Sequence, residues 1–187
     1  MFTKANLFNY TTSRASVKGA GVKQISSLKH LKRKGGKMKK EIRVVPITRR
    51  NWREMAALDI KEEQVPFLAP HMGLYLLARH YAEPEWDIYA LSGEECLIGG
   101  FSLRLFSERP LRCGLERFFI HAPFQGRGWG VLSLKAIISF VRTTYPEAEI
   151  VDLTVTPDNE RALSLYTGFG FSPTGEKDGL VWMAYSL

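Results

Sequence analysis

The chain has 187 residues and a formal net charge of +7, from 26 basic and 19 acidic side chains. Residues 1–40 hold eleven of the basic side chains and no acidic one, so this segment carries +11 and residues 41–187 carry −4. With 45% hydrophobic residues, the chain is too apolar to be disordered throughout, and no apolar run approaches the ~18–20 residues of a membrane helix. These numbers predict a basic extension followed by a single mildly acidic globular domain over residues 41–187.

The first forty residues are rich in Ser, Thr, Lys and Gly and lack a sustained apolar periodicity, so we expect them to be unstructured. Three interpretations stay open. The segment is basic, Ser-rich and acid-poor, like a mitochondrial targeting sequence. A basic arm of this kind also suits nucleic acid or an anionic surface. Alternatively, translation begins at Met38, since residues 34–37 (KGGK) are what a ribosome-binding sequence such as AAAGGAGG would encode in frame.

Apolar periodicities predict an α/β domain in the rest of the chain. In chain order they predict a strand at 42–47, a helix capped by Thr48 and ending near Asp59, a helix at 71–81, a hairpin of 87–91 and 95–106, and a strand at 112–121. A long helix over 128–144, a buried strand at 150–155, a helix from Asp158 or Asn159 to Thr167, and strands at 169–171 and 180–185 follow. The predicted order is βααββββαβαββ, with a mixed sheet.

Cysteines and histidines give no sign of a metal site. Cys96 and Cys113 form no CxxC pair, and the four histidines show no metal-ligand spacing. We therefore expect no bound metal, and two ordinary thiols in a reducing, cytoplasmic compartment.

A glycine-rich segment at residues 118–130 (FFIHAPFQGRGWG) connects a predicted strand to the long helix. Glycines at such a junction let the backbone approach an anion, and the amides of the helix N-terminus point at it, which suits a pyrophosphate. The segment fails the dinucleotide pattern GxGxxG, because Val131 stands at the third glycine position, and it lacks the Gly-Lys-Ser/Thr of a P-loop. A tight turn into a helix, without a ligand, is the alternative.

A second motif at residues 155–171 (VTPDNERALSLYTGFGF) joins a buried strand to a helix. Together, the Gln-x-x-Gly-x-Gly of 125–130 and the Asn-x-x-Ala-x-x-Leu-Tyr-x-x-x-Gly-Phe of 159–171 resemble the GNAT superfamily of acetyl-CoA-dependent N-acetyltransferases. The resemblance covers residues 42–187, and residues 115–120 (LERFFI) are most similar to the spermine/spermidine branch. At His121, bacterial relatives often have Asp. The resemblance implies a mixed, mostly antiparallel sheet with a splayed central pair of parallel strands and about four flanking helices.

By matching positions, the resemblance also implies a set of site residues. Phe118, Phe119 and Ile120 would offer backbone groups to pantetheine and the acetyl carbonyl, and Asn159 would contact the coenzyme arm. Tyr166 stands where the family places the acid that protonates the departing thiolate. The pyrophosphate would be held by the amides of Gln125, Gly126, Arg127, Gly128, Trp129 and Gly130.

Acetylation of an amine needs a neutral nucleophile, so a carboxylate near the acceptor is expected. Glu116 could bind the ammonium group and relay its proton through water as general base. Glu62 and Glu63, between the first two helices, would bind the remote amines of a polycation. The alternatives are that Glu116 pairs with Arg117 or Arg104 on a solvated strand face, and that the two glutamates form a solvated helix end. Tyr166 could equally be a core aromatic.

The leading hypothesis from the sequence is direct acetyl transfer from acetyl-CoA to a primary amine of a polyamine such as spermidine or spermine. Alternative acceptors are a protein or peptide amino group, an amino acid or an amine-bearing antibiotic, and a non-catalytic acetyl-CoA-binding module is a further alternative. We expect a small cationic amine as partner, no membrane, and no nucleic acid because the folded body sums to −4. A homodimer is also implied by the resemblance.

Overall fold

The computed structural model describes residues 41–107 and 111–187. The predicted extension at 1–40 and the alternative start at Met38 lie outside the described residues. The described elements are β1 (Arg43–Pro46), α1 (Trp52–Ala56), η2 (Glu62–Gln64), α2 (Met72–Ala82), β2 (Asp87–Ser92), β3 (Leu97–Phe106), β4 (Arg112–Ile120), η3 (Ala122–Phe124), α3 (Trp129–Thr144), β5 (Ile150–Val155), α4 (Glu160–Phe169), β6 (Ser172–Lys177) and β7 (Leu180–Ser186).

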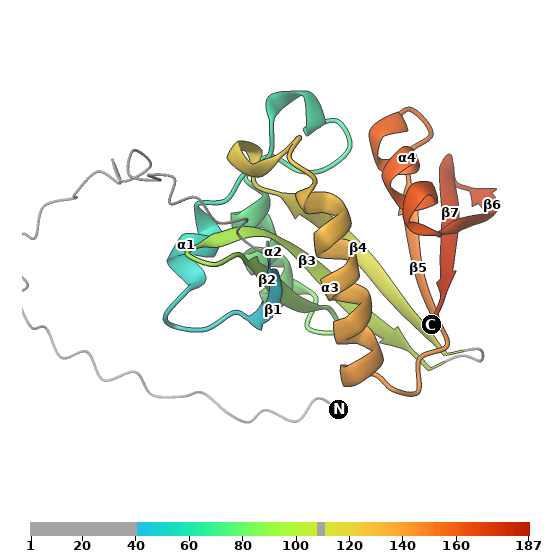
Figure 1. The fold of residues 1–187 in the computed structure, drawn as a ribbon, viewed down its shortest axis with the longest axis horizontal. Coiled ribbons are helices and arrows are strands. Elements are labelled where there is room, and N and C mark those ends of the chain that lie inside the picture. The colour runs from blue at the N-terminus through green and yellow to red at the C-terminus, as the bar shows by residue number, and fades with distance from the viewer. Residues whose placement is uncertain (1–40, 108–110) are drawn as a thin grey trace, which may run out of the picture. The chain divides into compact units, whose positions relative to one another are not determined.

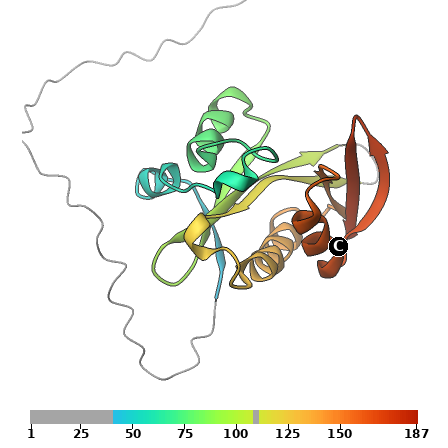
Figure 2. The same cartoon turned by 90° about the horizontal axis from the view of Figure 1, so that it is seen from above.

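The strands form one sheet in the order β1-β2-β3-β4-β5-β7-β6. Every neighbouring pair is antiparallel except β4 and β5, which are parallel. Helices α1 and α2 cover one face of the sheet, and α3 and α4 lie on the other (Figures 1 and 2). The predicted mixed sheet with one central parallel pair and flanking helices is therefore confirmed. None of the described helices is long and apolar enough to cross a bilayer.

Each face of the sheet has its own apolar core. On the α3 side, Leu134, Ile137 and Val141 are fully buried and recur with helical spacing. On the other side, Met55 of α1 packs with Met72 and Leu76 of α2. Full burial of one such side chain stabilises the fold by about 1.5–3 kcal/mol. These cores fix the positions of the helices from which the site is built.

The first helix is shorter than predicted. It begins after Asn51 rather than Thr48, because the Asn51 side chain accepts a hydrogen bond from the Thr48 N–H at 2.7 Å and closes a turn there. Beyond α1 the chain turns away from the helix axis, and the backbone of Asp59 meets His121, whose Nδ1 lies 3.0 Å from the Asp59 nitrogen. This contact joins residues 62 positions apart, so no local pattern predicts it.

Two strand predictions are wrong. Residues 169–171 form the end of α4 and its cap: Gly170 has a left-handed φ of 117°, and the Phe171 N–H donates to the Tyr166 carbonyl at 3.0 Å. The strand lies just beyond, as β6, and every residue of this edge strand is exposed, so it has no apolar alternation to detect. The described chain also has three strands, not four, between α2 and α3, because the hairpin contributes β2 and β3 and its neighbour contributes β4 alone.

Candidate active site

The parallel strands β4 and β5 separate partway along their length. Their register covers three residue pairs, ending at Gly114 and Asp152. Beyond that point, β4 continues to pair with β3 and β5 with β7. The exposed backbone edges of the two diverging strands therefore face an opening, which is the splayed pair that the resemblance implies.

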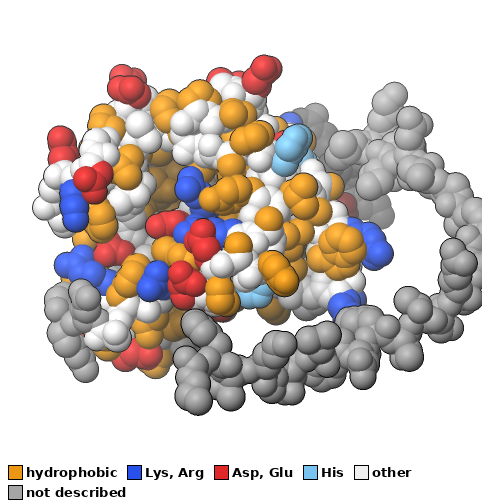
Figure 3. Space-filling model, turned by 180° about the vertical axis from the view of Figure 1, so that it is seen from behind, with side chains coloured by type: hydrophobic (Ala, Val, Ile, Leu, Met, Phe, Trp, Pro, Cys, Tyr) orange, Lys and Arg blue, Asp and Glu red, His pale blue; other side chains and the backbone are white. Residues whose placement is uncertain are grey.

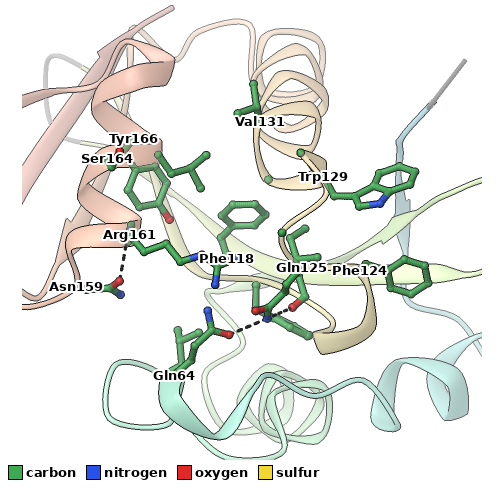
Figure 4. Close-up of a pocket in the computed structure, with 18 residues that line it drawn as sticks. Gln64, Phe118, Phe124, Gln125, Trp129, Val131, Asn159, Arg161, Ser164 and Tyr166 are labelled. Atoms are coloured by element: carbon green, nitrogen blue, oxygen red, sulfur yellow. Dashed lines mark hydrogen bonds between the residues drawn. The ribbon is translucent and has the colours of Figure 1, made fainter.

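A cavity of about 350 Å³ occupies this opening on the side of α3 and α4 (Figure 4). It is lined by Gln64, Leu68, Phe118, Phe119, Ile120, Phe124, Gln125, Gly126, Gly128, Trp129, Gly130, Val131, Asn159, Arg161, Ala162, Ser164, Leu165 and Tyr166. The structure thus brings together both sequence motifs. Of the residues predicted to bind coenzyme, Arg127 alone does not line the cavity.

The glycine loop faces the cavity with the backbone geometry that an anion site requires. Gly126 and Gly128 have φ values of 75° and 79°, a left-handed conformation that glycine adopts without strain. Gly128 is also the residue before the first turn of α3, whose leading amides have no carbonyl one turn back. No heavy atom lies within 4 Å of a Cβ built on either glycine, so the loop borders open space. The helix dipole adds a favourable field for negative charge.

Gln125 differs in detail from its predicted role. Its backbone N–H donates to the Ala122 carbonyl at 3.2 Å and is therefore engaged within the loop. Its side-chain Nε2 instead donates to the Ile120 carbonyl and to Oε1 of Gln64, both at 2.7 Å. The side chain thus joins the glycine loop to the end of β4 and to η2 (Figure 4). Gln64 was not predicted from the sequence, because its partner lies 61 residues away.

The end of β4 presents its backbone to the opening. The His121 N–H donates to the Ile98 carbonyl of β3 at 2.8 Å. Successive residues of a strand direct their N–H and C=O groups to opposite edges, so those of Ile120 point away from β3. Its carbonyl accordingly accepts from Gln125 on that side. The Ile120 amide therefore lies at the cavity, whereas the same alternation directs the backbone groups of Phe119 toward β3, which does not fit the role predicted for that residue.

A second cavity, of about 320 Å³, adjoins the first. It is lined by Phe67, Leu68, Leu115, Glu116, Arg117, Phe118, Thr154, Val155, Thr156, Asn159, Ala162, Tyr166 and Leu180. Phe118 and Tyr166 are among the residues that line both cavities. A ligand in one cavity would therefore meet a ligand in the other at these two side chains.

Glu116 is oriented by a buried arginine that sequence reasoning missed. Its Oε2 lies 2.8 Å from Nη1 of Arg79 in α2, a residue whose side chain is 8% exposed. Nε of Arg79 donates to Glu83 at 2.8 Å, and its guanidinium lies 4.2 Å from the ring centroid of Trp86. Although burial lowers the pKa of Arg79, the hydrogen bonds to Glu83 and Glu116 raise it above the ordinary value. Glu116 therefore has a fixed cationic partner and still lines the second cavity.

The alternative pairing of Glu116 with Arg117 or Arg104 is not found among the described residues, since Glu116 pairs with Arg79. Arg104 lies instead 3.6 Å from Glu85. Acidic and basic side chains lie next to one another on the face that α1 and α2 cover (Figure 3). No signal in the sequence singles out Arg79, because its partners are the C-cap residue of its own helix, Glu83, and two strand residues, Ser102 and Glu116, that lie 23 and 37 positions later.

Tyr166 and Asn159 stand at the junction of the two cavities. The Tyr166 ring packs edge-on against Phe171 at 5.5 Å, and its hydroxyl points into the first cavity (Figure 4). Burial raises the pKa of Tyr166, so the hydroxyl stays protonated at neutral pH. The Asn159 side-chain oxygen accepts from the Ala162 N–H at 3.1 Å and caps α4, which leaves its NH₂ group at the cavity wall.

The remaining predicted residues lie outside the cavities. Glu62 and Glu63 belong to η2 and are exposed, and Glu63 lies 3.5 Å from Lys61. Neither lines the cavities, although Gln64 and Leu68 of the same segment do. In the described ranges, no three His, Cys, Asp or Glu side chains are close enough together to hold a metal ion.

Comparison with known proteins identifies the family. Residues 52–171 match the acetyltransferase (GNAT) family, and the chain belongs to it. It is 35% identical over 104 residues to the spermine/spermidine N(1)-acetyltransferase of Bacillus subtilis. That match covers 53% of this chain and 65% of the relative, so the chain spans just under two thirds of the relative's length.

Two solved structures share the fold. Spermidine N-acetyltransferase from Vibrio cholerae, in complex with CoA and spermine, superposes with a TM-score of 0.60 at 16% identity, over 78% of this chain and 95% of that one. An aminoglycoside acetyltransferase in complex with coenzyme A gives a TM-score of 0.64 at 17% identity, over 78% and 95%. At these identities the likeness shows the fold. Both neighbours bind coenzyme A, and they differ in the acceptor that their names describe.

Proposed function

We propose that this protein transfers an acetyl group from acetyl-CoA to a primary amine of a small molecule, by direct attack within a ternary complex. One observation carries the proposal: two cavities, one bordered by the N-terminus of α3 and one by the Glu116 carboxylate, meet between the diverging strands. The left-handed glycines and open space at the start of α3 fit a pyrophosphate. Acetyl-CoA would supply an activated acyl group as its thioester.

The residues of the chain have separate parts in this transfer. Glu116 would receive, through water, the proton that the attacking amine loses, a loss that costs about 5 kcal/mol at pH 7 for an amine like that of lysine. The Ile120 amide would donate to the carbonyl oxygen as negative charge develops on it. Tyr166 would give its proton to sulfur as the C–S bond breaks and the C–N bond forms, and regain one from solvent. No covalent enzyme intermediate is needed.

The acceptor class has two candidates. A polyamine is supported by the names of the curated relatives and by the predicted roles of Glu62 and Glu63. Both glutamates are exposed and line neither cavity, so they could contact only the far end of a long acceptor. An amine that also carries an anionic group is favoured instead by the opposite charges of Glu116 and Arg117 in the second cavity.

Release of thiol from acetyl-CoA tests the proposal. We expect release above the acceptor-free rate with at least one small amine in a panel of polyamines, diamines, amino acids and aminoglycosides. Peptides and protein amino groups serve as comparison acceptors. Turnover with peptides alone would reject a small-molecule acceptor, and no turnover with any amine would reject the proposal.

A further inference from the structure

We propose that the second cavity recognises an amine that also carries a carboxylate, and that Arg117 binds this anion. The inference rests on the proposed acetyl transfer and names the acceptor class for the same site. Arg117 follows Glu116 directly, so an ammonium group at the glutamate and a carboxylate at the arginine would lie close together in the ligand. That arrangement is the one found in amino acids.

A bulge in β4 places both charged side chains on one face of the sheet. Neighbouring residues of a regular strand point to opposite faces. Arg117 has a φ of 52°, and the register between β3 and β4 shifts at this position. In consequence Glu116 contacts Arg79, and the Arg117 guanidinium lies 5.4 Å from the ring centroid of Tyr75. Tyr75 and Arg79 lie one turn apart on α2, so both charges face the same helix.

The charges in the cavity suit a zwitterion better than a polycation. Among the described residues that line it, Glu116 and Arg117 are the two with a formal charge at neutral pH. Nε of Arg117 is buried without a hydrogen-bond partner, and no ion pair joins this residue to a carboxylate in the described ranges. A carboxylate could accept two parallel hydrogen bonds from its guanidinium. The second ammonium group of a polyamine would instead meet a like charge.

The remaining lining indicates the kind of amino acid. The wall includes Phe67, Leu68, Leu115, Val155 and Leu180, which are all apolar. An apolar side chain attached between the amine and the carboxylate would be buried against them. The backbone strain is consistent with a functional arginine, since a left-handed conformation costs a residue with a Cβ about 1–2 kcal/mol.

Matched pairs of ligands that differ in the carboxylate alone test the inference. We would measure by calorimetry the binding of leucine and 3-methylbutylamine, phenylalanine and 2-phenylethylamine, and lysine and cadaverine to the full chain saturated with coenzyme A. Spermidine would be included for comparison. The carboxylated member of the leucine or phenylalanine pair should bind at least about 10-fold more tightly, the size expected for hydrogen bonds between charged groups.

Variants then assign the effect to the arginine. Arg117→Gln should reduce the ratio within each pair to below about threefold, and Arg117→Lys should give an intermediate ratio because it keeps the charge without the fork. Arg104→Gln is the matched control, since Arg104 lies on the adjacent strand outside both cavities and should leave the ratio unchanged. Thermal unfolding would establish that each variant is folded.

The outcomes separate this inference from the proposed function. Equal affinity within the pairs, tighter binding of spermidine, binding of no ligand, or an unchanged ratio in folded Arg117→Gln would overturn it. Preferential binding of the amino acid without thiol release from acetyl-CoA would refute the proposed acetyl transfer and leave the recognition by Arg117 standing.

Discussion

Replacement of Arg79 by methionine tests whether the buried arginine orients Glu116. The substitution keeps an unbranched side chain of similar length but removes two ion pairs of 2.8 Å and the contact with Trp86 at 4.2 Å. Hydrogen bonds between charged groups contribute about 1.5–3 kcal/mol each, and a partly buried cation–π contact about 1 kcal/mol. Because Glu83 and Glu116 are more than a third exposed and regain water, the low end of these values applies.

We therefore expect Arg79→Met to lose about 2–4 kcal/mol of unfolding free energy, which lowers the thermal midpoint by about 5–12 °C. Glu116 would lose its fixed orientation, and a displacement of about 1 Å can cost 100-fold in rate. The kcat/KM for the amine should thus fall about 10- to 100-fold. The KM for acetyl-CoA should change less than about twofold, because Arg79 does not line the first cavity.

Glu83→Gln is the control, since Glu83 binds the same guanidinium but lines neither cavity. It should lower stability and leave the amine kinetics within about twofold of the parent protein. If Arg79→Met destabilised the protein and left amine kinetics unchanged, the arginine would be structural and would not position Glu116. An unchanged midpoint would contradict the buried ion pairs themselves.

Four further predictions concern the junction of the two cavities, the contact of η2 with the glycine loop, and the core. Tyr166→Phe should lower kcat at least about 100-fold while the Kd for coenzyme A stays within about twofold, and an unchanged kcat would exclude the acid role. Asn159→Asp should keep the cap of α4 but weaken coenzyme A binding about 10-fold. Asn159→Ala should weaken this binding too and should also lower the free energy of unfolding by about 1 kcal/mol, because the cap is lost. If both variants bound coenzyme A as tightly as the parent protein, Asn159 would not belong to the coenzyme site. A double-mutant cycle of Gln64→Ala and Gln125→Ala should give a coupling free energy of about 1 kcal/mol in coenzyme A affinity, because the two side chains are hydrogen-bonded. Additive effects would show that this bond between η2 and the glycine loop does not support coenzyme binding. Burial raises the pKa of Cys113 to about 12, above its value in the unfolded chain, so this thiol should lower the free energy of unfolding by about 1.4 kcal/mol per pH unit above pH 9. Cys113→Ala should reduce the pH slope of an alkaline denaturation series by one proton. An unchanged slope would contradict the burial of a neutral thiol.

Elements with long periodic patterns or distinctive cap residues were predicted well from the sequence. The strand at 150–155 has the predicted bounds, and the helix predicted at 128–144 begins at Trp129 and ends at Thr144. The glycine loop and the motif that begins at Asn159 meet at one cavity, as their resemblance to the family implies. Local sequence was enough in these cases because the residues that define the feature are neighbours in the chain.

The environment of the charged residues could not be predicted in the same way. Glu116 lines the second cavity, but its partner Arg79 comes from a helix that packs on the sheet, and Gln64 contacts Gln125 across 61 residues. Arg117 has a left-handed backbone conformation, which the sequence does not predict because such conformations are usually marked by Gly or Asn. Tertiary contacts between distant residues therefore determine these features. A sequence pattern predicts packing only where buried residues recur at regular spacing along one helix or strand.

The bulge at Arg117 explains how one strand serves two cavities. In a regular strand, Phe118 would share a face with Glu116, and both would point toward α2. The extra residue reverses the alternation, so that Phe119 packs in the core beneath α1 and α2 while Phe118 packs on the side of α3. The strand thereby directs its charged pair to the second cavity and an aromatic ring to the boundary with the first. In the proposed transfer, acetyl-CoA and the amine would approach from opposite sides and meet at the backbone of this single strand.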